Sequence, residues 1–261
     1  LPFWWAGNVF KETGDRITPK KGSARGRATR DRQVYIYTEG EVTEPEYIDI
    51  IVRKGLWDRP DRKVQHHIAN ENAESKYRKP YRMVQEAVRT RAKAEGEARR
   101  AGLKPYEVHQ DGTEEGDWNW PQVWVVFDRD DHQGIPEAMT LADDEKIHVA
   151  YSHPCFELWR LLHYTNYTST FGGVCGDANS RLRSRPGFAG TYGPGVQRVS
   201  EQESKHLRED QVLSEDGHRY ESARKYAKKI NEYHSTRNPN AWDPYTNVWC
   251  LVEQGLLLGG Y

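Results

Sequence analysis

The chain has 261 residues, enough for one domain with a substantial core or for one domain with an appendage. Its 38 Lys and Arg residues nearly balance its 39 Asp and Glu residues, so net charge alone does not indicate a nucleic-acid binder. The mean hydropathy is low, at −0.95, but nine Trp and fifteen Tyr supply apolar surface that disordered chains lack. We therefore expect a folded domain with long polar segments.

The cysteine pattern and the lack of long apolar runs bear on the cellular compartment. Cys155, Cys175 and Cys250 are odd in number and form no CxxC pair, which predicts neither a disulfide framework nor a zinc site. No apolar run approaches the roughly 18 residues of a membrane span, and the first residues do not resemble a signal peptide. The expected location is the reducing cytoplasm, with no membrane contact.

The first 32 residues predict a flexible, basic N-terminal arm. They contain Pro, Gly and Thr together with a spread of basic side chains that includes Lys20, Lys21, Arg25, Arg27, Arg30 and Arg32. Such an arm can follow a phosphate backbone through charge alone, or it can be an ordinary solvated terminus.

Residues 33–164 alternate between strand and helix patterns, which predicts an α/β core with a mainly parallel sheet flanked by helices. Strands are expected at 34–38, 63–69, 123–127 and 147–151. Helices are expected from residue 44, over 75–102, over 135–141, and from residue 156. Residues 106–120 are expected to form an acidic loop.

The run from Val123 to Phe127 is apolar throughout, as in a strand that is buried on both faces, and three acids follow it: Asp128, Asp130 and Asp131. The carboxyl ends of parallel strands are where open α/β sheets build ligand sites. On extended chain, Asp128 and Asp130 point the same way. Their repulsion, about 4 kcal/mol at an effective dielectric near 20, favours a neutralising cation. The alternative is a polar turn in which Asp131 opens a helix.

Two further acids stand near expected strand ends. Glu39 follows the strand at 34–38, so its carboxylate reaches the same crevice as Asp128 if the two strands are parallel neighbours. Glu157 lies in the first turn of a largely apolar helix, where charged side chains are rarely buried without a partner. It is either an acid of the site's network or a surface residue on a narrow wet face.

Residues 165–214 are rich in Gly, Ser and Arg and lack apolar periodicity, which predicts an irregular loop that is mobile or disordered. Arg181, Arg183 and Arg185 stand at alternate positions, so an extended loop would place them along a phosphate backbone. Residues 215–261 are expected to form a helical C-terminal part that packs on the core, with one amphipathic helix over 220–233 and a closing helix within 238–258.

Four motifs, in order, resemble the RloB family of bacterial phage-resistance and abortive-infection proteins. They are Glu-Gly-Glu-x-Thr-Glu-Pro-x-Tyr ending at Tyr47, Val-Val-Phe-Asp-Arg-Asp-Asp ending at Asp131, His-Pro-Cys-Phe-Glu-Leu-Trp-x-Leu-Leu-His ending at His163, and Pro-Tyr-Thr-Asn-Val from Pro244. Together they cover roughly residues 34–257. This family is similar to the Toprim domains of topoisomerases, primases and overcoming-lysogenization-defect nucleases.

The resemblance implies a Toprim-like fold whose site is a Glu after the first strand and a DxD after a later one. It assigns Glu39, Asp128 and Asp130 as catalytic residues. The expected cofactor is Mg²⁺ or Mn²⁺, held by these three residues and Asp131. Supporting positions match at three residues: Glu44, His153 and Glu157. Nucleic acid is the implied substrate, and an ATPase of a defence locus is a possible partner.

Three functions remain open at this point. The first is a divalent-metal-dependent nuclease of anti-phage defence that cleaves phosphodiester bonds of DNA or RNA. The second is a non-catalytic Toprim-like subunit that binds nucleic acid or a partner, and the third is a purely structural subunit. The loop over 165–214 and the C-terminal part depart from a compact Toprim domain. No GxxxxGK[ST] motif for an ATPase is present.

Overall fold

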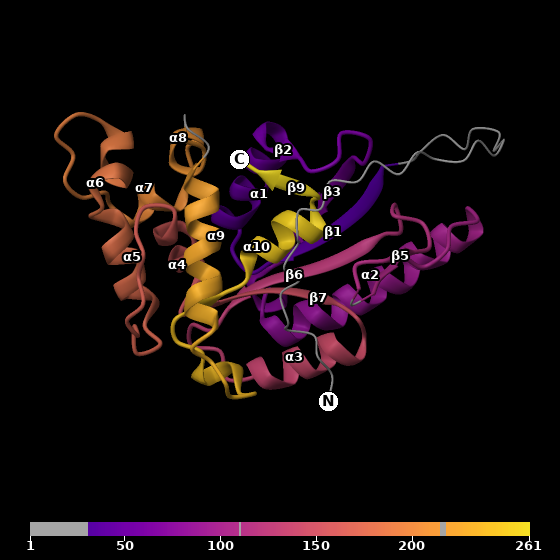
Figure 1. The fold of residues 1–261 in the computed structure, drawn as a ribbon. Helices are drawn as coiled ribbons and strands as arrows, with labels where there is room; N and C mark the ends of the chain where they lie inside the picture. The colour runs from indigo at the N-terminus through magenta and orange to yellow at the C-terminus, as the bar shows by residue number, and fades with distance from the viewer. Residues whose placement is uncertain (1–30, 110, 215–217) are drawn as a thin grey trace.

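A computed structural model describes residues 31–109, 111–214 and 218–261 and shows a mixed α/β fold (Figure 1). Its central sheet has five strands in the order β3-β1-β6-β7-β8. Their bounds are β1 Arg32–Thr38, β3 Val64–Ile68, β6 Gln122–Asp128, β7 His148–His153 and β8 Tyr245–Thr246. All pairs are parallel except β7 with β8. The predicted fold class, a mainly parallel sheet flanked by helices, is confirmed.

Alternate residues of β1 and β6 divide the core between the two faces of the sheet. Val34 and Trp124 belong to one buried cluster, which contacts α1 (Thr43–Lys54), α4 (Phe156–Leu162) and α9 (His218–Asn231). Tyr37 and Val125 belong to the other, which contacts α2 (Pro80–Arg100) and α3 (Ile135–Asp144). Because successive strand residues face opposite ways, an apolar strand such as β6 must be covered on both sides. Figure 1 shows α2 and α3 together below the sheet.

The segment 165–214 is not the irregular loop that its composition predicts. It forms five short helical pieces, which Figure 1 shows gathered at one end of the molecule: α5 Cys175–Arg183, α6 Pro186–Ala189, η2 Gly190–Tyr192, α7 Glu201–Lys205 and α8 Glu209–Val212. Leu182, Phe188 and Val212 from this segment join the larger buried cluster. Helices of three to nine residues are too short to show a helical period in sequence, and for this reason the expectation was wrong.

The C-terminal part packs on the core, and it is only partly helical. After α9, the chain runs through η3 (Pro239–Ala241), β8, α10 (Val248–Cys250), the π-helical turn η4 (Leu251–Gly255) and β9 (Leu258–Gly260). Strand β9 pairs antiparallel with β2 (Leu56–Trp57). The Tyr47 hydroxyl, which accepts a 2.7 Å hydrogen bond from Trp159 Nε1, also contacts the Tyr261 hydroxyl. The closing segment is therefore tied to α1 and α4.

Arg32, predicted as part of the flexible arm, is instead a buried residue at the start of β1. Its side chain donates to the Trp118 carbonyl and, at 3.1 Å, to the Gln254 carbonyl. Burial lowers the pKa of Arg32 to about 10. Residues 1–30 of the predicted arm, including Lys20, Lys21, Arg25, Arg27 and Arg30, lie outside the described residues.

Two smaller elements complete the fold. Within the expected acidic loop, β4 (Glu107–Val108) and β5 (Glu114–Glu115) pair as a short antiparallel hairpin. The helical turn η1 (Ser75–Tyr77) precedes α2. Over the described ranges, no helix combines the length and apolar character needed to cross a membrane.

Candidate functional site

The carboxylate of Glu39 and the backbone of Asp128 meet where β1 and β6 end side by side. The two strands are parallel neighbours, with Thr38 opposite Val126. The Glu39 N–H donates to the Val126 carbonyl at 3.0 Å, and the Asp128 N–H donates to Glu39 Oε2 at 3.0 Å. The sequence predicts this meeting of strand ends, because parallel neighbours present their carboxyl ends at one edge.

A second segment fixes Asp128 from the corner between β7 and α4. Phe156, the first residue of α4, donates its N–H to Asp128 Oδ2 at 2.9 Å. Glu44 lies in the first turn of α1, is only 5% exposed, and accepts a 3.0 Å hydrogen bond from the Gly40 N–H at Oε1. The acids are therefore held by backbone donors of β6, α4 and the turn after β1.

Burial and mutual repulsion disfavour the ionised forms of Asp128 and Glu44. Desolvation, followed by the charges of Glu39, Glu44 and Glu157, raises the pKa of Asp128 well above its usual value. Desolvation, followed by Glu157 and opposed by the Gly40 N–H, raises the pKa of Glu44 from 4.5 to about 7. Like charges that cannot be solvated favour protonation or a bound cation.

Asp130 and Asp131 lie farther out than Asp128. Strand β6 ends at Asp128, and Asp130 has a φ of 28°, so the expected alternation along extended chain does not position it. Its N–H donates to the Pro154 carbonyl at 3.0 Å, and both Asp130 and Asp131 are exposed. Partial desolvation, followed by the charges of Asp131 and Glu39, raises the pKa of Asp130.

His132 belongs to this site, and the sequence analysis missed it. Its Nε2 lies 2.7 Å from Glu39 Oε1. The hydrogen bond to Glu39 is the main cause that raises the pKa of His132, against the effect of burial. The signal in the sequence was its position directly after the acidic run. The structure thus pairs Glu39 with the His132 imidazole on one oxygen and a backbone donor on the other.

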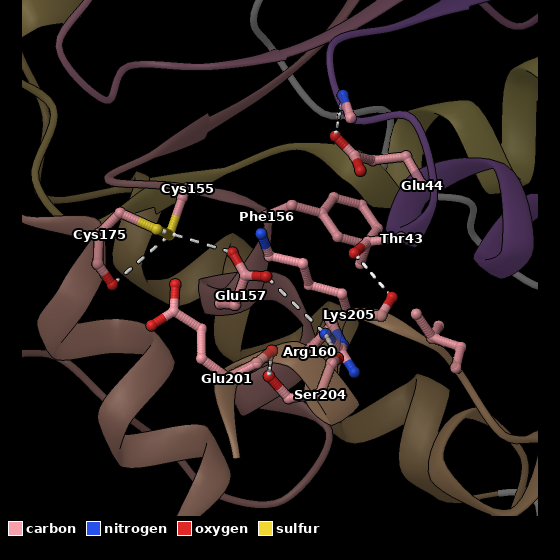
Figure 2. A network of polar contacts seen from close by, with 12 residues as sticks. Thr43, Glu44, Cys155, Phe156, Glu157, Arg160, Cys175, Glu201, Ser204 and Lys205 are labelled. Carbon is pink, nitrogen blue, oxygen red and sulfur yellow. Dashed lines mark hydrogen bonds and ion pairs between the residues drawn. A yellow bond between two sulfur atoms is a disulfide. The ribbon is translucent and has the colours of Figure 1, made fainter. Parts of the chain in front are cut away.

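The three predicted supporting residues are placed differently. Glu44 and Glu157 both act electrostatically on Asp128. Glu157 is largely covered, with 16% of its side chain exposed, and lies 3.8 Å from Arg160 Nη1 (Figure 2). Buried His153 has Nδ1 3.4 Å from the Pro239 carbonyl, and burial lowers the pKa of His153. It faces the loop before β8 rather than the carboxylates.

The three arginines predicted to bind nucleic acid do not lie on extended chain. Arg181 and Arg183 are in the last turn of α5, and Arg185 follows it. Positions two apart on a helix do not share a face, so a single phosphate track along all three is ruled out. Arg183 donates to the Val199 carbonyl at 3.3 Å, whereas Arg181 is exposed with its guanidinium over the Tyr167 ring. A role in nucleic-acid binding stays a prediction.

The expectation of no disulfide is wrong. Cys155, next to Phe156, is bonded to Cys175, the first residue of α5. The partners are 20 positions apart, and only the packing of α5 on α4 brings their Cα atoms to 5.4 Å. Cys250 is a free cysteine.

The chemistry of the donor set fits a hard divalent cation. Carboxylate oxygens are the ligands that Mg²⁺ and Mn²⁺ take, and a double positive charge would offset the repulsion that acts on Asp128. Within the part of the chain that the structure describes, however, Glu39, Asp128 and Asp130 do not bring one oxygen each within 4.8 Å of one another. A cation with several waters in its shell, as is usual for Mg²⁺, suits that spacing better than a closed protein cage.

Fold and site together define a class: an α/β protein with a partly buried carboxylate cluster, held by backbone N–H groups, at the carboxyl edge of a parallel sheet. The family model described as RloB-like protein matches residues 34–254. The chain belongs to the RloB-like protein family. No curated protein and no solved structure matches it.

Proposed function

We propose that this chain is a divalent-metal-dependent nuclease of anti-phage defence, with Glu39, Asp128 and Asp130 as its catalytic acids. One observation carries the proposal: Asp128 is held by the Phe156 N–H in a poorly solvated place where Glu39, Glu44 and Glu157 all oppose its ionisation. A polar turn would let its carboxylates separate into water. Here the Asp128 N–H holds Glu39 and the Phe156 N–H holds Asp128 at one edge of the sheet, which supports a cation site.

The residues of the site would have different roles according to how deeply they are buried. Asp128, with Glu39 oriented by the Asp128 N–H and His132, would hold the inner side of the cation, and exposed Asp130 and Asp131 would face solvent and substrate. Bound Mg²⁺ or Mn²⁺ would activate water and neutralise charge at the scissile phosphate. His132, whose pKa is raised by its hydrogen bond to Glu39, would accept or donate a proton at the outer side of the site.

Purified protein should cleave at least one of plasmid DNA, single-stranded DNA and tRNA with Mg²⁺ or Mn²⁺ and not with EDTA. Asp128→Asn and Asp130→Asn keep the side-chain size but lose the charge, and each should abolish cleavage. Asp144→Asn, an exposed acid at the end of α3, is the matched control and should keep it.

The same assay addresses the non-catalytic alternative inferred from sequence. A protein that binds nucleic acid without cleaving any of the three substrates, with binding unaffected by EDTA, would refute the nuclease proposal. An ATPase partner is part of the proposal only through the family resemblance. A co-expressed ATPase from the same locus should increase cleavage if that part is right.

A further inference from the structure

Cys155, Glu157 and Cys175 form a compact group beside the carboxylates. Within the described residues, each places one potential ligand atom within 4.8 Å of the others. Glu157 Oε2 lies 3.7 Å from Cys175 Sγ. Figure 2 shows the two sulfur atoms and the Glu157 carboxylate facing one another, with Arg160 on the far side of Glu157.

We propose that this group is a redox-gated site for a soft divalent cation, Zn²⁺, which it binds when the Cys155–Cys175 bond is reduced. The inference does not rest on the nuclease proposal, since it concerns other ligands and another metal.

Ligand type separates this site from the acids around Asp128. Thiolates are soft ligands that select Zn²⁺ over Mg²⁺, whereas the all-oxygen cluster has the opposite preference. An iron–sulfur cluster takes four Cys ligands, or two Cys with two His, and this group of two Cys and one Glu supplies neither set. Two Cys ligands and one carboxylate leave a fourth position for water, as in zinc sites that remain open.

Charge balance favours an ion of charge +2. Two thiolates and the Glu157 carboxylate carry three negative charges, and Zn²⁺ with the Arg160 guanidinium carries three positive ones. Arg160 is held in place because its Nη1 donates to the Ser204 carbonyl at 2.8 Å, and it stays 3.8 Å from Glu157 Oε1. Cys175 is the first residue of α5, where the helix dipole favours its thiolate form.

The backbone already has the spacing that the metal needs. Zn–S bonds of about 2.3 Å at a tetrahedral angle separate two sulfurs by about 3.8 Å. The Cα atoms of Cys155 and Cys175 are 5.4 Å apart, which allows that separation through side-chain rotation. Cys155 is 2% exposed and Cys175 is half-buried, so the ion would enter from the α5 side.

The gate is thiol–disulfide exchange. A dithiol reductant attacks one sulfur, the Sγ–Sγ bond breaks, and the reductant closes its own disulfide. Two electrons and two protons are thereby transferred to Cys155 and Cys175. Binding of Zn²⁺ then releases those two protons to solvent. A disulfide oxidant reverses the sequence: the two thiolates give up two electrons and form the Sγ–Sγ bond, the oxidant takes up these electrons with two protons from solvent to become two thiols, and Zn²⁺ is released.

This site is close enough to influence the carboxylates. Cys155 lies between Pro154, whose carbonyl accepts from the Asp130 N–H, and Phe156, whose N–H donates to Asp128. Coordination of Glu157 would also neutralise a charge that acts on Asp128. Zinc in the reduced protein would therefore alter the field at the neighbouring acids without replacing any of their ligands.

Cobalt provides a direct probe, because thiolate coordination gives Co²⁺ a charge-transfer absorption that carboxylates do not. The full chain, reduced with a phosphine under nitrogen, is titrated with Co²⁺ and then with Zn²⁺. We expect one Co²⁺ per chain with thiolate absorption, which Zn²⁺ abolishes. The same chain after oxidation, with Cys250 as the one thiol detectable after denaturation, should give no such absorption.

Variants assign the ligands. Cys155→Ser and Cys175→Ser should each remove most of the absorption, and Glu157→Gln should keep it but weaken affinity by about 10-fold or more, the range known for changes around metal ligands. Cys250→Ser is the matched control and should behave as the unaltered chain. Comparison of reduced and oxidised unaltered protein needs no substitution, so it remains decisive if a serine variant fails to fold.

The proposal is overturned if the reduced, unaltered chain shows three titratable thiols and no thiolate–cobalt absorption, which would leave a redox disulfide only. It is overturned equally if the absorption persists in both serine variants or disappears in Cys250→Ser. None of these readouts involves nucleic acid, so they are independent of whether the protein proves to be a nuclease.

Discussion

Replacing Glu44 by Gln should make the metal-free protein more stable. The Gln side chain keeps an oxygen that can accept from the Gly40 N–H, as Glu44 Oε1 does at 3.0 Å, but it carries no charge. Glu44 is 5% exposed, and burial together with Glu157 disfavours its ionised form. The substitution therefore removes the unfavourable charge and leaves the hydrogen bond.

The pKa of Glu44 gives the size of the effect. It is raised from 4.5 to about 7 in the folded protein, and each pKa unit corresponds to about 1.36 kcal/mol. The ionised side chain thus lowers the free energy of unfolding by about 3 kcal/mol. For a domain of this size, that corresponds to roughly 6–12 °C in melting temperature.

The pH dependence has a definite sign. A carboxyl whose pKa is raised on folding takes up a proton as the chain folds at intermediate pH, so stability is lost as pH rises from 4.5 through 7. Below pH 4.5 both states are protonated and the difference vanishes. Glu44→Gln should exceed the unaltered protein by about 3 kcal/mol at pH 8 and match it near pH 4.

Urea denaturation in EDTA at pH 8 and pH 4 measures both values. Asp49→Asn, on the same helix with 60% of its side chain exposed, is the control and should change stability by no more than about 0.5 kcal/mol. Lower stability of Glu44→Gln at pH 8 would refute the reasoning. It would mean that neighbouring groups fully offset the cost of burying the Glu44 charge. The electrostatic argument for a bound cation would then also be refuted.

Three further predictions concern neighbouring residues. His132→Gln should reduce the free energy of unfolding, measured by urea denaturation, more at pH 6 than at pH 8.5. The pKa of His132 is raised above its ordinary value of 6.5 in the folded protein, so protonation of His132 stabilises the fold below pH 6.5. This stabilisation is lost as the pH rises through the raised pKa. His109→Gln, at an exposed His–Glu pair, is the control, and equal losses at both pH values would contradict the role of Glu39. Arg183→Ala should lower the melting temperature, since its hydrogen bond to Val199 and its packing are lost, whereas Arg181→Ala should leave the melting temperature unchanged. Arg181→Ala should instead flatten the salt dependence of nucleic-acid binding by about one unit of slope. An unchanged slope would exclude a phosphate contact by Arg181. Tyr47→Phe should cost about 1–3 kcal/mol because it leaves the buried Trp159 N–H without its acceptor, and a loss below about 0.5 kcal/mol would show that the indole finds another partner.

The sheet and the meeting of Glu39 with Asp128 could be predicted because their causes are local. An apolar run with an acid at its end indicates both a buried strand and the position of that acid. Parallel pairing of two such strands then brings their terminal acids to the same edge of the sheet. His132 was equally close in sequence, but nothing in an isolated histidine shows that its ring turns back to Glu39 rather than into solvent.

What could not be predicted depends on contacts between distant segments. The Cys155–Cys175 bond requires α5 to pack on α4, and residues 165–214 show no period long enough to reveal α5. Arg32 looked like part of a basic arm because its partners, the carbonyls of Trp118 and Gln254, are 86 and 222 positions away. Composition describes the average behaviour of a segment and not which of its members is buried.

The contact between the hydroxyls of Tyr47 and Tyr261 spans 214 positions, so it cannot form until Tyr261 has been synthesised. At roughly 5–20 residues per second, a ribosome needs about 10–40 s to make the chain between them. Glu39 and Asp128 can come together once α4 has been made, but the apolar sides of α1 and α4 are not fully covered until the closing segment packs on them. During translation the acidic edge would thus be assembled while one side of the apolar core is still exposed. A chaperone could bind that apolar surface until the segment that ends at Tyr261 has been made.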